Sequence, residues 1–360
     1  MDWFLHSLQV FGERAPDFFK FFASILYEAL PFVVLGAAIA GILEELVPQQ
    51  LIGRILTGLE RWVPGGVVRV AAILLGGILG LAFPMCECGI IPVMRRLLGK
   101  GLPLSCCTAY LLAGPIINVV VMTSTYAAFS GAGEPAVGAA RFSPQMPTLT
   151  MVALRVGLGY VVAVLTSLVV EWQWRRHGSK LLLPLAMPGG KGRTDDDGSL
   201  WRSRPLLQRL SNISETALHD FVDITLFLML GALLASGVRT FLSHEDIAAL
   251  ATQNPLLVIV LMMGLAVVLC LCSEADAFVA ASFTTLPSAA KLAFLVLGPM
   301  LDLKLYFMYT RVFRPRLIWT IITAVVVQVF LYSVITHYVW VDYAAPPPPD
   351  QAAAAAAADR

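Results

Sequence analysis

The chain has 360 residues, of which 58% are hydrophobic and 14% are charged, and its formal net charge is +1. So few charged side chains cannot cover the water-facing surface of a soluble protein, and a net charge near zero gives no bulk attraction to nucleic acid. All six cysteines lie in two short stretches outside the polar loops, which excludes a disulfide-stapled extramembrane domain.

Apolar runs long enough to cross ~30 Å of hydrocarbon follow one another along the chain. Hydropathy predicts eight spans: residues 18–43, 67–84, 102–129 and 149–172, then 219–241, 255–271, 286–309 and 317–340. A shorter apolar piece follows the second span of each set, at 89–98 and 275–283, and is expected to form a half-helix or a re-entrant turn. The predicted fold class is an all-α polytopic membrane protein.

The polar segments divide this chain into four expected parts. These are an N-terminal transmembrane repeat (1–173), a basic linker (174–216), a C-terminal transmembrane repeat (217–341) and a disordered tail (342–360) rich in proline and alanine. The expected location is the cell inner membrane. The linker carries eight Lys and Arg residues, so the positive-inside rule predicts that it faces the cytoplasm. Arg95, Arg96 and Lys100 are expected on the same side, and the acidic pair Glu44 and Glu45 outside.

The halves resemble each other at a constant shift of 184 positions, which indicates two internally repeated four-helix units. Shared apolar composition explains matched leucines, but it explains poorly why helix-breaking and cysteine motifs coincide. The positions that coincide are Cys86 with Cys270, Cys88 with Cys272, Pro103 with Pro287, Gly114 with Gly298, Pro115 with Pro299, and Asn118 with Asp302. Helices broken by proline that meet near the membrane midplane are typical of transporters.

The relative orientation of the two copies stays open. Four crossings per half would make the copies parallel. However, the basic residues follow the cysteine motif in the first half, whereas Arg311, Arg314 and Arg316 follow the Gly-Pro helix in the second. That exchange is what inverted copies would show.

Cysteine pairs are the first candidate ligands. Thiolates prefer Cu(I), Zn(II) and similar thiophilic ions. Two cysteines separated by one residue point about 200° apart on a helix, so they converge only where the chain is unwound, as Pro84 and Pro92 suggest. The predicted metal ligands are Cys86, Cys88, Cys270 and Cys272. Packing is almost as good an explanation for Cys106 and Cys107, which have no counterpart in the second half.

Charged and amide side chains at membrane depth usually mark an ion or substrate path. Glu87 and Glu274 are candidates for a coupling proton or a cation site, whereas Asp302 and Lys304 are as well explained by mutual neutralisation. Glu28, Asp220 and Asp223 lie near span ends and are expected at the interface. The whole predicted substrate-binding set is Cys86, Glu87, Cys88, Gly89, Pro92, Gly114, Pro115, Asn118, Cys270, Cys272, Glu274, Gly298, Pro299 and Asp302, with Asp276 and Lys304 beside it.

Enzyme motifs do not occur in the sequence: there is no nucleotide-binding loop, no dinucleotide fingerprint and no His-Glu-x-x-His. We therefore expect no enzymatic activity and no cofactor, and transport driven by an ion gradient unless a partner supplies ATP. The expected partners are the lipid bilayer and a small-molecule or ion substrate, but not nucleic acid. A homo-oligomer is compatible with the sequence.

The segments MCECGIIPV, GLPLSCCTAYLLAGPIINVVVM and LAFLVLGPMLDLK resemble the ArsP/YraQ-type predicted permease family over residues 27–338. The resemblance implies a bacterial inner-membrane permease with about eight spans, in a family that includes exporters of trivalent organoarsenicals and proposed copper or zinc efflux proteins. It points to Cys86, Cys88, Gly89, Pro92, Gly114, Pro115 and Asn118. The second half departs from the motif, because Cys272 is followed by Ser273 and Glu274 rather than by glycine.

Three functions are consistent with these features, and a purely structural membrane scaffold is the fallback interpretation. The favoured hypothesis is an exporter of a thiophilic metal or metalloid. A permease for another small solute, such as a sulfur compound, is the second. A membrane thiol–disulfide carrier is the third, although the usual Cys-x-x-Cys spacing is missing.

Overall fold

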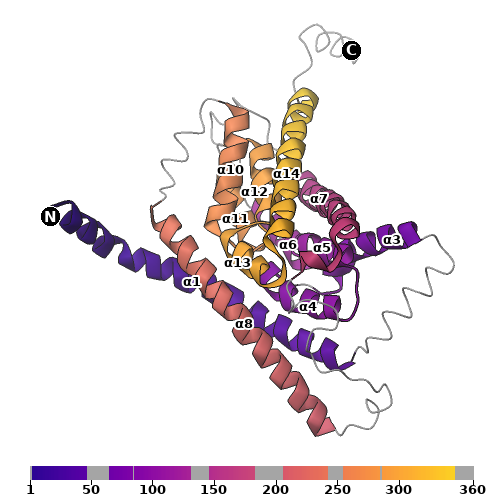
Figure 1. Cartoon of the computed structure of the whole chain (residues 1–360). Coiled ribbons are helices and arrows are strands. Elements are labelled where there is room, and N and C mark those ends of the chain that lie inside the picture. Colours follow the sequence, from indigo (N-terminus) through magenta and orange to yellow (C-terminus); the bar gives the residue numbers. More distant parts are fainter. Residues whose placement is uncertain are drawn as a thin grey trace, which may run out of the picture.

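The computed structural model describes residues 2–46, 65–83, 85–130, 146–182, 206–241, 254–283 and 286–344. Within these ranges all regular secondary structure is helical, apart from one isolated bridge between Leu182 and Phe313 (Figure 1). The prediction of an all-α protein is therefore confirmed.

Within the described residues, each half of the chain begins and ends with a long helix and has four short helices between them. The first half contains α1 (Asp2–Leu46), α3 (Gly65–Ile78) with a short 3₁₀ turn after it, α4 (Glu87–Gly99), α5 (Leu104–Ala113), α6 (Val119–Ser130) and α7 (Thr148–His177). The second half contains α8 (Leu206–Phe241), α10 (Pro255–Leu269), α11 (Ala275–Ser282), α12 (Ser288–Leu297), α13 (Leu303–Val312) and α14 (Pro315–Ala344).

Among the described residues, four helices are long and apolar enough to cross a membrane: 15–45 of α1, α7, 210–238 of α8 and 315–340 of α14. The predicted spans 102–129 and 286–309 are each two short helices, because the chain turns at Pro115 and at Pro299. Pro92, in contrast, lies inside α4 and does not interrupt it, so it does not bound an unwound segment. Pro84 lies outside the described residues.

The expected boundaries of the linker fall within helices. Helix α7 continues to His177 and α8 begins at Leu206, so both helices extend into the segment 174–216. The remainder of that segment, 183–205, and the tail from 345 onward lie outside the described residues.

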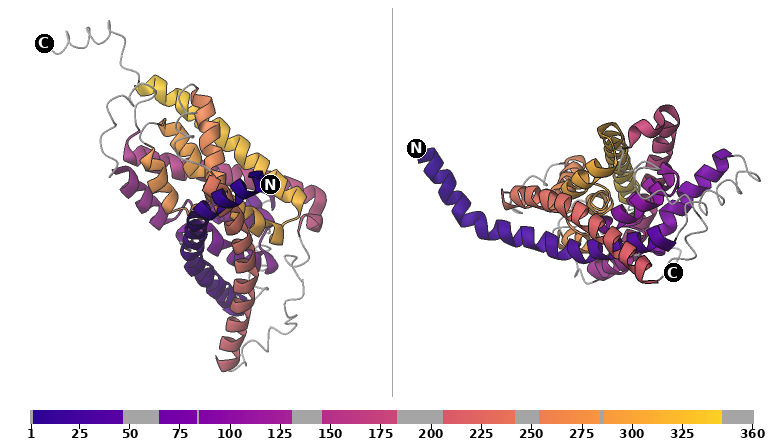
Figure 2. Two further views of the ribbon diagram at one scale, coloured as in Figure 1. Left: turned by 90° about the vertical axis from the view of Figure 1, so that its left-hand side faces the viewer. Right: turned by 60° about the horizontal axis from the view of Figure 1, so that its bottom comes forward.

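The two halves interlock through their short helices. Helix α4 contacts α13, and α6 contacts α11, so each contact joins one half to the other. The long helices α1 and α8 lie side by side along this assembly, α1 against α4 and α8 against α13 (Figure 1). Helices α3, α5 and α7 form one group and α10, α12 and α14 another. The N-terminal end of α1 extends beyond the other helices (Figure 2).

Two glycines set the distance between the long helices and the short ones. A Cβ atom added to Gly36 of α1 would collide with the backbone of Gly89 in α4, and one added to Gly231 of α8 would collide with the backbone of Lys304 in α13. Both short helices therefore lie directly on glycine, which lets helix backbones approach closely inside a membrane.

Glu44 lies next to the basic end of α4. Its Oε2 atom is 3.8 Å from Lys100 Nζ and 3.9 Å from Arg96 Nη1, and Lys100 also donates to the Glu44 carbonyl oxygen at 2.8 Å. The prediction that placed Glu44 on the opposite side of the membrane from these basic residues was wrong. It relied on the sign of each loop's charge and could not allow for ion pairs between loops.

Candidate functional site

Four short helices begin where the halves meet. Cys86 precedes α4, Asn118 precedes α6, Glu274 precedes α11 and Asp302 precedes α13. The unsatisfied amide groups at a helix start carry partial positive charge, so these four starts favour negatively charged groups nearby. In line with this, Asp302 Oδ1 accepts a hydrogen bond from Leu305 N at 2.6 Å.

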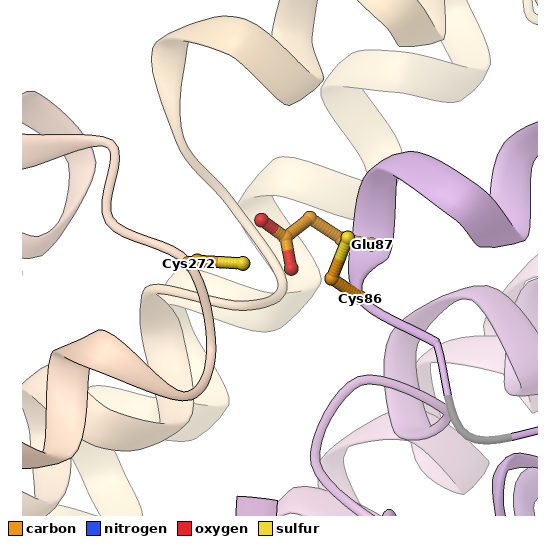
Figure 3. Close-up of side chains that lie close together, drawn as sticks. All are labelled: Cys86, Glu87 and Cys272. Carbon is orange, nitrogen blue, oxygen red and sulfur yellow. The ribbon is translucent and has the colours of Figure 1, made fainter. Parts of the chain in front are cut away.

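Two thiols and a carboxylate converge at this junction. Cys86 Sγ, one carboxylate oxygen of Glu87 and Cys272 Sγ all lie within 4.8 Å of one another. The exposed fractions of these residues are 0%, 1% and 6%. Cys272 comes from the loop between α10 and α11 and faces the other two residues, which lie at the start of α4 (Figure 3). We call these three residues the thiol–carboxylate cluster.

The backbone at Cys86 explains how adjacent cysteine and glutamate side chains meet. Cys86 has extended dihedral angles (φ −70°, ψ 169°) and directly precedes the first helical turn, so it does not follow the helical spacing of Glu87 and Cys88. Its thiol interacts with those of both Cys88 and Cys272. Cys88 itself lies outside the cluster.

Cys270 is separate from this cluster. Its thiol donates to the Val267 carbonyl oxygen at 3.4 Å, and it packs with Ile25, Ala232 and Ala235. Its φ angle of 49° places it in the left-handed region, which costs energy for a residue other than glycine. The predicted four-cysteine set is therefore brought together only in part: Cys86 meets Cys272 and also interacts with Cys88, whereas Cys270 lies apart. Cys106 and Cys107 are buried in α5.

Lys304 supplies a buried positive charge beside the cluster. Its Nζ lies 2.7 Å from Glu87 Oε1 and 3.5 Å from Asp302 Oδ2, with the carbonyl oxygens of Leu271 and Cys270 at 3.3 and 3.4 Å. Lys304 and both carboxylates are at most 2% exposed. The sequence suggested a pair of Lys304 with Asp302, but the shorter contact is with Glu87 in the other half.

Some polar atoms here lack a partner. Within the described residues, Glu87 Oε2, Asn118 Nδ2 and Glu274 Oε1 are buried without a hydrogen bond. Buried polar groups are nearly always satisfied, so orphaned atoms in one region are consistent with a site that a bound solute completes.

The other predicted site residues lie at a helix start, at a contact between helices and in turns. Asn118 Oδ1 accepts from Val120 N at 2.9 Å and so begins α6 as Asp302 begins α13. Gly89 packs under α1. The turns between α5 and α6 and between α12 and α13 contain Gly114, Pro115, Gly298 and Pro299.

Comparisons with other proteins identify the family. A family model described as "Predicted permease" matches residues 15–338. The chain belongs to this predicted permease family. The UPF0718 protein YcgR of Bacillus subtilis is 36% identical over 310 residues, which cover 86% of this chain and 92% of that protein. A "Putative two-component membrane permease complex subunit" of Streptococcus mutans is 28% identical over 298 residues, or 82% and 87%. No solved structure matches the chain.

The permease also contains a buried charge that the sequence analysis missed. Arg155 of α7 is 1% exposed, and its Nη2 lies 2.8 Å from both carboxylate oxygens of Asp276 and 2.9 Å from the Ser273 carbonyl oxygen. Its Nη1 donates to Thr125 Oγ1 at 2.6 Å. A lone arginine in the apolar run 149–172 was the available signal, because charges at that depth are rare without a function. We call these residues the Arg155 network.

A second charged network joins the basic ends of α4 and α13 to α8. Arg96 makes two hydrogen bonds of 2.8 Å to Asp220, and Arg311 lies 3.0 Å from Asp223. Arg95 is 3.5 Å from Asp223. Asp220 is fully buried, and its carboxylate is paired with Arg96. These five residues form the basic-end network of the permease.

Proposed function

We propose that this permease exports a thiophilic metal or metalloid species and that the thiol–carboxylate cluster binds it. The observation that carries the proposal is the convergence of Cys86, Glu87 and Cys272 within 4.8 Å in a buried junction between the two halves. Sulfur ligands select soft ions, and a carboxylate adds a charged oxygen ligand. Charged groups at such depth cost free energy that a purely structural protein has no reason to incur.

The number of converging thiols favours a particular substrate chemistry. A monosubstituted trivalent arsenical with two hydroxyl groups can bind two thiols. Each new arsenic–sulfur bond releases one hydroxyl, which leaves as water with the thiol proton. Cys86 and Cys272 supply two thiols from opposite loops, and a divalent or monovalent thiophilic cation would use the same two sulfurs together with Glu87.

The arrangement of helices supports an inverted repeat, in which α1, α3–α4, α5–α6 and α7 correspond to α8, α10–α11, α12–α13 and α14. The order of elements is the same in both halves. The contact of α4 with α13 and that of α6 with α11 exchange with each other under this correspondence, as any two-fold axis relating the halves requires. The positions of the basic helix ends favour an axis in the membrane plane.

This correspondence gives each half three crossings and one re-entrant hairpin. The basic ends of α4 and α13 meet in one network although they follow different motifs, which is the exchange that inverted copies produce. Helices α3 and α4 would enter from the cytoplasm and return to it, and α10 and α11 would do so from outside. The protein then lies in the inner membrane, with the linker and the basic-end network facing the cytoplasm.

The proposal is tested in cells that lack their own metal and metalloid exporters. Growth is measured on a panel of trivalent arsenicals, Cu, Zn and Cd salts with wild type, Cys86→Ser, Cys272→Ser and Cys270→Ser. We expect wild type and Cys270→Ser to give resistance to at least one compound and the other two variants to give none. Equal resistance in all four strains would exclude a role for the cluster.

Transport by everted membrane vesicles then separates the competing functions. Accumulation of the protective compound under an imposed proton gradient supports export, whereas the opposite direction supports an uptake permease. A thiol–disulfide carrier would instead show thiol labelling of Cys86 and Cys272 that changes with an applied redox buffer and does not depend on the compound.

A further inference from the structure

The Arg155 network ties three helices to the loop that carries Cys272. Thr125 belongs to α6, Arg155 to α7 and Asp276 to the first turn of α11. Arg155 also holds the carbonyl oxygen of Ser273, the residue after Cys272, at 2.9 Å. Any separation of α6, α7 and α11 must therefore break contacts that lie next to the cluster.

Breaking these contacts costs much free energy because they are buried. Arg155 and Asp276 are 1% and 2% exposed, and the ion pair has two contacts of 2.8 Å with one nitrogen. Removing one partner of such a pair leaves an uncompensated charge in a low-dielectric surrounding. The pair therefore opposes opening on this side unless water or another charge replaces the lost partner.

Under the proposed topology, the basic-end network lies on the cytoplasmic side of the cluster and the Arg155 network on the outer side. The basic-end network lies where α4 and α13 end, whereas the Arg155 network lies among α6, α7 and α11. The side chains of Arg96, Asp223 and Arg311 are 20%, 20% and 38% exposed, so this network is partly exposed, whereas the Arg155–Asp276 pair is buried. A small cavity between α4, α8 and α13 is lined by Ile91, Arg95 and Met308 among others.

We propose that the Arg155–Asp276 pair is the outer gate of the permease, and that the basic-end network is the corresponding inner gate. This inference rests on the proposed transport function and topology. With both networks formed, the cluster is closed from both sides, as an occluded state in alternating access requires. Solute leaves to the outside when Arg155 releases Asp276 and the Ser273 carbonyl, which frees the Cys272 loop.

The experiment measures access to Cys272 from each side of the membrane. Cys272 is kept as the sole cysteine, and a membrane-impermeant maleimide is added to right-side-out or to everted vesicles. We expect slow labelling from both sides in this parent. Arg155→Gln and Asp276→Asn should raise the rate from outside by about tenfold or more, since each removes the pair that keeps this side shut. Neither should change the rate in everted vesicles.

The matched control is Asp223→Asn in the basic-end network, which should raise labelling only in everted vesicles. Thr125→Val is a milder outer variant that keeps the ion pair and should give a smaller increase. Each variant is first checked for membrane insertion and a single symmetric elution peak. Unchanged outside labelling in both outer ion-pair variants, or equal increases from both sides, would overturn the proposal. Because no solute is present, a permease with another substrate would still give the expected pattern.

Discussion

Lys304 Nζ lies 2.7 Å from Glu87 Oε1, and this ion pair connects α13 of the second half with α4 of the first. The pair brings a positive charge to the edge of the thiol–carboxylate cluster and offsets part of its negative charge. Asp302, at 3.5 Å from the same ammonium group, is the second carboxylate that Lys304 compensates. One lysine therefore balances carboxylates from both halves.

Removing Lys304 should cost more stability than removing Glu87. Lys304→Met leaves Glu87 and Asp302 buried without a cation, whereas Glu87→Gln leaves Lys304 paired with Asp302. Breaking a buried pair typically costs about 3–5 kcal/mol, and we expect Lys304→Met at the upper end of that range and Glu87→Gln below it. Thermal unfolding of the purified protein in detergent measures both.

The double variant Glu87→Gln, Lys304→Met completes a double-mutant cycle with the two single variants. Its loss of stability should be smaller than the sum of the two single losses, because the two partners are removed together. Additive losses would show that Lys304 and Glu87 do not interact in the folded protein.

Gly231 should not tolerate even one additional methyl group. The Cβ atom of Gly231→Ala would lie about 2.5 Å from Lys304 Cα, so α8 and α13 must move apart and displace Lys304. We expect lower thermal stability and weaker binding of a thiophilic probe.

Gly264→Ala is the matched control, since a Cβ atom at Gly264 of α10 meets nothing within 4 Å. It should be neutral or slightly stabilising, because alanine favours a helix by up to about 1 kcal/mol over glycine. If Gly231→Ala behaved like this control, the close approach of α8 to α13 would be disproved.

The proposed topology predicts which side of the membrane each hairpin faces. In a cysteine-free background, Gly66→Cys and Gly99→Cys report on the two ends of the α3–α4 hairpin, where added side chains meet no other atoms within 4 Å. Asn254→Cys and Ser282→Cys report on the ends of α10–α11, where both side chains are exposed. An impermeant maleimide should label the first pair only in everted vesicles and the second only in right-side-out vesicles. If the two residues of either pair were labelled from different sides, that helix pair would cross the membrane and would not be a re-entrant hairpin.

Much of the fold could be predicted from the sequence, because hydropathy and proline act locally. The long helices α1, α7, α8 and α14 follow from apolar runs, and the breaks at Pro115 and Pro299 follow from proline chemistry. Pro92 was misread, because a helix held by its neighbours on both sides accommodates a proline that an isolated helix would not.

The candidate site could be predicted only as a list of residues. The constant shift aligned Cys86 with Cys270, yet Cys86 meets Cys272. The reason is that the start of α4, in the first half, packs against the loop before α11, in the second half. The partners of Lys304 and Arg155 likewise lie in other helices. Such pairings depend on how the halves pack, and no local pattern in the sequence contains that information.

The most direct test of the central claim is binding of Cd²⁺ to the purified permease, followed by cadmium–thiolate charge-transfer absorbance. Wild type and Cys270→Ser should give the same absorbance at saturation, whereas Cys86→Ser and Cys272→Ser should each lose about half of it or more and bind at least about tenfold more weakly. If Cys272→Ser bound like wild type while Cys270→Ser did not, the thiol–carboxylate cluster would not be the binding site.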